Sequence, residues 1–124
     1  MSWNSGKNVT EPNERLALLK GTLDLLIMKA LSHGPTHGYG ITTWLHKSSG
    51  GRIVAEDSAV YQALHRMESR RLIEAEWGVT ENNRRARYYR LTQEGRAALR
   101  AEAESWQQYA NSVADILALE EGTA

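Results

Sequence analysis

The chain has 124 residues, of which 41% are hydrophobic and 24% are charged, which is typical of one globular domain with its own core. It contains no cysteine, which excludes disulfides, cysteine-ligated zinc and thiol catalysis. Fifteen Lys and Arg balance fifteen Asp and Glu, but five of the acids and none of the bases lie after residue 100. Residues 1–100 therefore form a basic body and the rest an acidic tail.

The polar residues 1–12, which end in Pro12, predict a flexible N-terminal arm. Asn13 is a candidate N-cap for a first helix, because apolar residues then recur at three- and four-residue spacing to Leu31. Gly21 is expected to weaken the middle of this helix. A glycine and a proline at positions 34 and 35 predict that the helix ends near Ser32.

Two further helices are expected in the next forty residues. The second covers about residues 38–47, and the third begins at Asp57 or Ser58 and ends near Arg70. Residues 53–54 between them indicate a very short strand. On the third helix the spacing predicts a buried stripe of Val60, Leu64 and Met67. The opposite face, free to contact a partner, consists of Ser58, Gln62, His65 and Ser69.

A β-hairpin is predicted after the third helix. Ile73, Ala75 and Trp77 alternate with polar residues or glycine, which indicates a half-buried strand, and residues 87–91 are rich in strand formers. The polar segment 79–85 between them is expected to turn the chain. The second arm of this hairpin carries arginines with no acid between them: Arg84, Arg85, Arg87 and Arg90.

A long C-terminal helix capped by Thr92 is predicted to follow the hairpin. Its apolar residues repeat with the alternating spacing of a heptad seam, which predicts dimerisation. The seam consists of Leu99, Ala103, Trp106, Ala110, Val113 and Leu117. The apolar segment 16–31 is interrupted by three charges, so we expect no membrane span, and the start of the chain has no signal-peptide core. We expect a cytoplasmic protein.

Three helices followed by a hairpin is the element order of a winged helix-turn-helix, whose third helix enters the DNA major groove. The predicted fold class is therefore mainly α with a small β-hairpin: a winged helix-turn-helix plus a long C-terminal dimerisation helix. The expected divisions are an arm (1–12), a DNA-binding domain (13–91), a dimerisation helix (92–119) and a disordered tail (120–124). Basic residues on the hairpin and the third helix suit phosphate contacts.

Four ordered motifs make the chain resemble the PadR family of transcriptional regulators. They are KGTLDLLIMKAL (residues 20–31), GPTHGYGI (34–41), VYQALHRME (60–68) and AEWGVTENNRRARYYRLTQEGR (75–96). The resemblance covers about residues 18–117. It implies a dimeric repressor of the short branch of the family, which has a single C-terminal helix, acting on a pseudo-palindromic operator. It further implies a small aromatic inducer bound at the dimer interface, where Trp106 is the candidate contact.

This sequence departs from the family pattern in the third helix and just after it. Ser58, Ala59 and Gln62 stand where family members typically have a glycine, a hydroxyl residue and a proline, and Arg71 stands where glycine is common. The operator therefore does not follow from the resemblance. The predicted DNA-binding residues are Tyr39, Ser58, Ala59, Tyr61, Gln62, His65, Arg66, Asn82, Asn83, Arg84, Arg85 and Arg87.

Other readings of the sequence are weaker. His33 and His37 have a zinc-like spacing, but Pro35 separates them and no third ligand is evident. We therefore expect no metal site. We read His37 as a residue that packs locally or caps the start of a helix. No motif assembles a nucleophile with its base, so we expect neither an enzyme nor a cofactor.

Two alternatives to an inducible repressor remain: a dimeric winged-helix protein-interaction module and a DNA-binding protein without a ligand. For Trp106, the alternative to an inducer contact is that the indole only fills space between packed helices.

Overall fold

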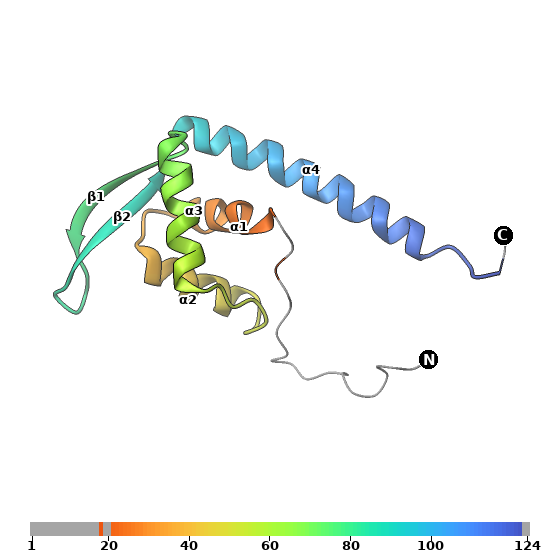
Figure 1. Cartoon of the computed structure of the whole chain (residues 1–124), viewed down its shortest axis with the longest axis horizontal. Coiled ribbons are helices and arrows are strands. Elements are labelled where there is room, and N and C mark those ends of the chain that lie inside the picture. Colours follow the sequence, from red (N-terminus) through yellow and green to blue (C-terminus); the bar gives the residue numbers. More distant parts are fainter. Residues whose placement is uncertain (1–17, 19–20, 123–124) are drawn as a thin grey trace.

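The computed structural model describes residue 18 and residues 21–122. Three short helices, α1 (Thr22–Leu31), α2 (Gly38–Ser48) and α3 (Asp57–Ser69), pack together beside an antiparallel hairpin of β1 (Ile73–Val79) and β2 (Arg85–Leu91). A long helix, α4 (Gln93–Leu117), extends away from this body (Figure 1). The predicted fold class, mainly α with a small hairpin and a long last helix, is confirmed.

The core lies where α1, α2, α3 and the base of the hairpin meet. Its side chains come from the periodic apolar positions of each element, because one face of each helix must leave water. The largest fully buried side chains are Ile27, Met28, Leu31, Ile41, Val60, Leu64, Met67 and Ile73. Three of these, Val60, Leu64 and Met67, are the stripe predicted on α3.

The first helix of the described residues, α1, begins at Thr22. Gly21 adopts a left-handed conformation with φ 89° and stands as the N-cap of α1, so a helix running from Asn13 through Gly21 is wrong at this point. A right-handed helix cannot continue through such a residue. The predicted start at Asn13 lies outside the described residues. The predicted end is correct, since Ser32 is the C-cap.

The predicted strand at residues 53–54 is also wrong, because this segment pairs with no strand among the described residues. The Ile53 N–H donates instead to the Ser49 hydroxyl oxygen at 2.8 Å, which ties the loop to the end of α2. A strand pairing that the sequence did not indicate occurs elsewhere. Thr36 and Tyr89 exchange two backbone hydrogen bonds of 3.2 and 2.8 Å, so the segment before α2 lies against β2. Burial raises the pKa of the Tyr89 phenol.

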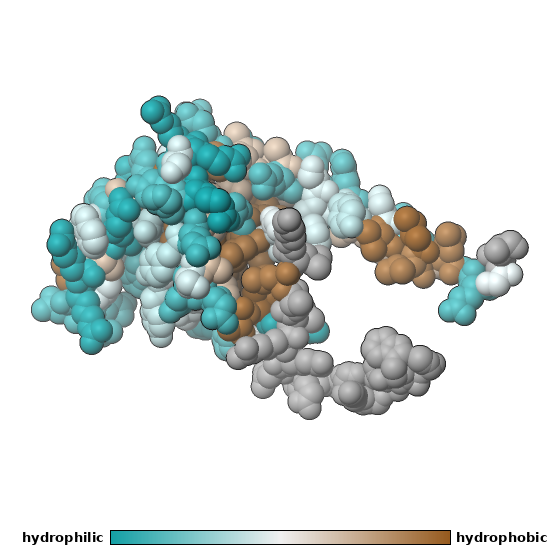
Figure 2. Space-filling model, viewed as in Figure 1, coloured by the Kyte–Doolittle hydropathy of each residue, from teal (hydrophilic) through white to brown (hydrophobic). Residues whose placement is uncertain are grey.

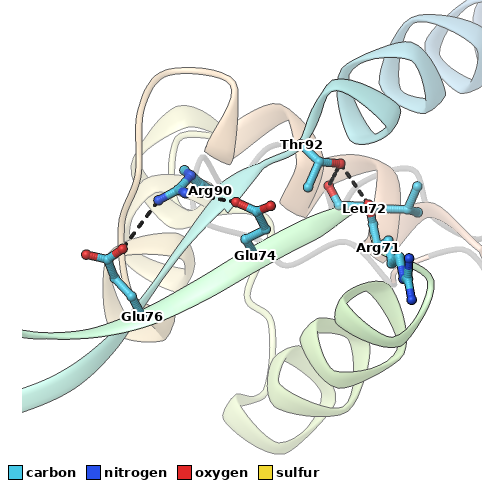
Figure 3. Close-up of polar contacts among 6 residues, drawn as sticks. All are labelled: Arg71, Leu72, Glu74, Glu76, Arg90 and Thr92. Carbon is cyan, nitrogen blue, oxygen red and sulfur yellow. Dashed lines mark hydrogen bonds and ion pairs between the residues drawn. The ribbon is translucent and has the colours of Figure 1, made fainter.

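Thr92 links the start of α4 to the turn that follows α3 (Figure 3). Its hydroxyl donates to the Arg71 carbonyl at 2.7 Å and accepts the Gly95 N–H at 3.0 Å, and its own N–H donates to the Leu72 carbonyl at 3.0 Å. Arg71 has φ 63°, a conformation that costs energy for a side chain with a Cβ. One threonine thus caps α4 and holds the strained turn between α3 and β1.

Replacing Thr92 by Val keeps the side-chain shape but removes its hydroxyl. We expect the free energy of unfolding to fall by about 1–2 kcal/mol, since the helix cap and the bond to Arg71 are both lost. Urea unfolding followed by circular dichroism measures this. Thr92→Ser, which keeps the hydroxyl, is the matched control and should lose much less.

Candidate nucleic-acid interface

The outward face of α3 is polar and exposed. Ser58, Gln62 and His65 are exposed, whereas Val60 and Leu64 are buried on the opposite side. This separation follows from the helical period, which places the apolar residues toward the core and leaves the polar ones outside. Ala59 is half-buried and offers only a methyl group. Side chains of the types Gln and His can hydrogen-bond base edges in a major groove.

Two tyrosines flank this face, and both are largely exposed: Tyr39 in the first turn of α2 and Tyr61 on α3. The Tyr61 ring lies against Gly38, where a Cβ would collide with the ring and its hydroxyl. Gly38 therefore lets Tyr61 lie across the start of α2. His37 is the N-cap of α2, and its Nδ1 accepts the Gly40 N–H at 3.0 Å. The reading of His37 as a helix-start cap is confirmed.

The neighbouring His33 packs against Trp44 with 5.1 Å between ring centroids. Within the described residues no group of three or more His, Cys, Asp or Glu could hold a metal ion. These two histidines therefore have local structural roles, one in packing and one in capping.

The hairpin of β1 and β2 is called the wing below. Its tip is the turn at residues 80–84. The Thr80 N–H donates to the Arg84 carbonyl at 2.8 Å, and the Asn83 N–H donates to the Thr80 carbonyl at 2.9 Å. Asn83 has φ 63°, which asparagine tolerates better than most residues. Asn82, Asn83 and Arg84 are all exposed at this tip.

The four wing arginines, which follow one another in the sequence without an acid, differ in the structure. Arg90 lies 2.8 Å from Glu74 and 3.5 Å from Glu76, both on the paired strand (Figure 3). Arg87 makes a bidentate ion pair with Glu68 of α3. Its Nη1 and Nη2 donate to the two carboxylate oxygens at 3.2 and 3.0 Å. Two of the four arginines are therefore already paired with acids, which come from other elements of the fold.

Arg84 and Arg85 have no acidic partner within the part of the chain that the structure describes. They are the exposed cations nearest the wing tip. Arg66 of α3 is exposed, but its Nη2 lies 2.8 Å from Asp24 Oδ1 on α1. The assignments of Arg66 and Arg87 to DNA stay predictions, and both guanidinium groups would have to exchange a carboxylate for a phosphate.

A groove separates α2 from the wing turn. Aromatic and basic side chains line it together, among them Tyr39, Tyr61, Tyr88, Lys47 and Arg84. Lys47 was not among the predicted contacts, because its place near the wing depends on how α2 packs and not on its own sequence neighbours. This groove adds a second basic surface beside the exposed face of α3.

Trp77 was not among the residues predicted to lie on the surface of the hairpin. Its alternation with Ile73 and Ala75 predicted a half-buried side chain, but Trp77 is 56% exposed. The reason is that the core ends near Ala75, and the hairpin projects beyond it. The Arg85 guanidinium lies over the Trp77 ring, 4.3 Å from its centroid.

The predicted heptad seam follows one face of α4. Leu99, at its start, packs against the core. Trp106 lines a groove between α1 and α4, together with Leu25 and Tyr109, and its ring centroid lies 6.0 Å from that of Tyr109. Ala103, Ala110 and Val113 are half-buried, and Leu117 is 77% exposed. The role of this seam in dimerisation stays a prediction.

Helices, hairpin and exposed third-helix face together define a winged-helix protein. Residues 27–101 match the model of the family described as the transcriptional regulator PadR-like family. The match covers more than half of the chain, and the chain belongs to this family. Proteins of this family are transcriptional regulators and not enzymes, which confirms the expected class.

Solved structures of the family resemble the chain closely. A PadR-like transcriptional regulator from Bacillus cereus has a TM-score of 0.71 and 27% identity, covering 82% of this chain and 97% of that one. A PadR family regulator from Eggerthella lenta has a TM-score of 0.70 and 29% identity, covering 81% and 85%. PadR of Bacillus subtilis, solved in complex with operator DNA, has a TM-score of 0.60 and 23% identity, covering 67% and 47%. The last likeness shows the fold alone.

Two curated relatives are similar in sequence. An uncharacterized protein of Lysinibacillus sphaericus is 25% identical over 92 residues, 74% of this chain and 84% of that protein. A 37.1 kDa protein in a transposon of Streptomyces fradiae is 36% identical over 81 residues, 65% of this chain and 22% of that protein. Among the described residues, no helix is long and apolar enough to cross a membrane.

Proposed function

We propose that the chain is a dimeric, sequence-specific DNA-binding repressor. One observation carries the proposal: the free polar face of α3 lies on the same small body as a wing whose tip cations, Arg84 and Arg85, have no acidic partner in the described chain. Cations without partners release counterions from DNA without first breaking an ion pair. The operator complex of Bacillus subtilis PadR supports the same use of a related fold.

In this proposal the two kinds of contact have different tasks. Gln62 and His65 on α3 read base edges in the major groove, with adenine and guanine as their respective partners. The wing contacts backbone phosphates and fixes the orientation of the domain without reading sequence. Tyr39 and Tyr61 lie where a DNA backbone would pass between α3 and the wing.

Dimerisation through α4 supplies the symmetry for a pseudo-palindromic operator. The two α3 helices would enter successive major grooves roughly 34–36 Å apart. A flat aromatic inducer that binds between α1 and α4 at Trp106 would change the spacing of the two α3 helices in the dimer. It would thereby favour the state that fits DNA poorly. The groove between α1 and α4 supports this step.

The test is fluorescence anisotropy of labelled DNA from upstream of the protein's own gene, against a scrambled duplex, over a range of salt. A repressor binds the upstream DNA more tightly, and log affinity falls by about 0.9 per log salt for each phosphate neutralised. Equally weak binding to both duplexes would favour a protein-interaction module or a more distant operator. Titrating aromatic compounds into the complex separates an inducible repressor from a DNA-binding protein without a ligand.

Replacing Arg84 and Arg85 together by Ala should weaken binding to both duplexes and reduce the salt slope by about 1.8, since two phosphate contacts are lost. The matched control is Arg96→Ala with Arg100→Ala, which removes the same charge from α4. A wing variant that keeps the wild-type slope would exclude the wing from the interface. By contrast, Gln62→Ala or His65→Ala should change the preference between sequences and leave the slope nearly unchanged.

A further inference from the structure

Trp77 is a large aromatic side chain on the surface of the wing, outside the core. It is 56% exposed, and Val79, two residues further along β1, is 63% exposed. Because side chains alternate along a strand, these two share a face of the hairpin with Arg85 and Arg87 on β2. An indole exposed in this way has apolar area that a folded chain normally removes from water.

The two guanidinium groups beside Trp77 have unequal surroundings. Arg87 lies 5.9 Å from the centroid of the Trp77 ring and 5.8 Å from that of Tyr89, and Glu68 of α3 holds its two terminal nitrogens. Arg85 lies closer, 4.3 Å from the Trp77 centroid, and has no acidic partner in the described chain. Trp77 therefore has two arginine neighbours. Arg87 is ion-paired to α3, whereas Arg85 has no acidic partner in the described chain.

This arrangement orders a side chain that would otherwise be mobile. A free arginine at a wing tip samples many rotamers, and binding a phosphate restricts them at a cost in entropy. Stacking on an indole restricts the same rotamers before binding, through the attraction of a cation to the ring face. The second arginine beside the ring, Arg87, is already held by Glu68 of α3.

We propose that Trp77 is a positioning residue that orients Arg85 toward a backbone phosphate of bound DNA. The proposal rests on the proposed DNA-binding function and adds a residue to it. Since phosphate and sugar contacts carry no sequence information, Trp77 should strengthen binding to every duplex alike.

The test is a double-mutant cycle of Trp77→Leu and Arg85→Ala, with affinity measured by anisotropy on upstream and scrambled DNA. We expect Trp77→Leu to weaken binding about 3-fold to 5-fold on both duplexes. Its effect should nearly vanish in the Arg85→Ala background, because the residue then has no arginine to orient. Trp77→Phe keeps an aromatic face and should retain most of the affinity.

Two controls separate this role from a purely structural one. Circular dichroism and the melting temperature show whether Trp77→Leu folds, and Trp77→Phe gives a second reading if it does not. Val79→Ala removes exposed apolar area from the same face and should leave affinity within 2-fold. Multiplicative effects of Trp77→Leu and Arg85→Ala, or wild-type affinity in Trp77→Leu, would overturn the proposal while leaving DNA binding intact. No DNA binding by the wild-type chain at low salt would overturn both.

Discussion

Replacing Trp106 and Val113 together by Glu should convert the proposed dimer into monomers and weaken operator binding by about 100-fold or more. The two residues are one heptad apart on α4, and both are half-buried. Two copies of the pair would place four carboxylates in one apolar seam, which costs far more than it gains. A monomer also loses the second half-site, so its binding no longer benefits from a high effective concentration.

The shape of the chain makes this effect large. At 1.5 Å per residue, the 25 residues of α4 extend about 37 Å, and its distal part projects from the body (Figure 1). Hydrophobic residues gather at that distal end (Figure 2), where Ile116 and Leu117 are 65% and 77% exposed. A second α4 is the partner that the heptad spacing fits.

Sedimentation equilibrium measures the mass, and anisotropy measures the DNA affinity of the same variant. The matched control is Ala101→Glu with Gln108→Glu, which adds the same charges at the same seven-residue spacing on the exposed opposite side of α4. It should remain dimeric. If the seam variant sediments as a dimer, the heptad assignment is wrong and another surface joins the two copies.

Gly95→Ala should lower the free energy of unfolding by about 3 kcal/mol, although alanine is the better helix former by about 1 kcal/mol. Gly95 is buried in the first turn of α4, and a Cβ there would collide with the backbone carbonyl of Leu72 and crowd the Leu91 side chain. A backbone atom cannot rotate away as a side chain can. Relief therefore requires α4 to shift from the turn that follows α3.

The midpoint of urea unfolding measures this loss. Ala97→Gly is the control, because Ala97 is exposed in the same part of the helix and should lose only the propensity difference of about 1 kcal/mol. Since α4 would carry the dimer contact and α3 the DNA contact, the shift in Gly95→Ala should also reduce operator affinity at temperatures where the variant is folded. Unchanged or increased stability would show that the close contact relaxes freely.

Much of the fold was predictable because it depends on neighbours in the sequence. The spans of α2, α3 and α4 follow from apolar spacing and capping residues, and Thr92 acts as the cap that its position predicted. The exposed face of α3 follows from the same helical period. The first helix was predicted to continue through Gly21, which was read as a weak helical residue, whereas its left-handed backbone places Gly21 outside α1.

The candidate interface was predictable only in outline. A basic hairpin after a third helix with one polar face could be predicted, because side-chain period and turn residues act over a few positions. Three features could not be predicted and appear only in the folded chain: Glu68 binds Arg87, Arg85 stacks on Trp77, and the core ends before Trp77. These contacts join residues from different elements, and their free energies depend on distances that no local pattern contains.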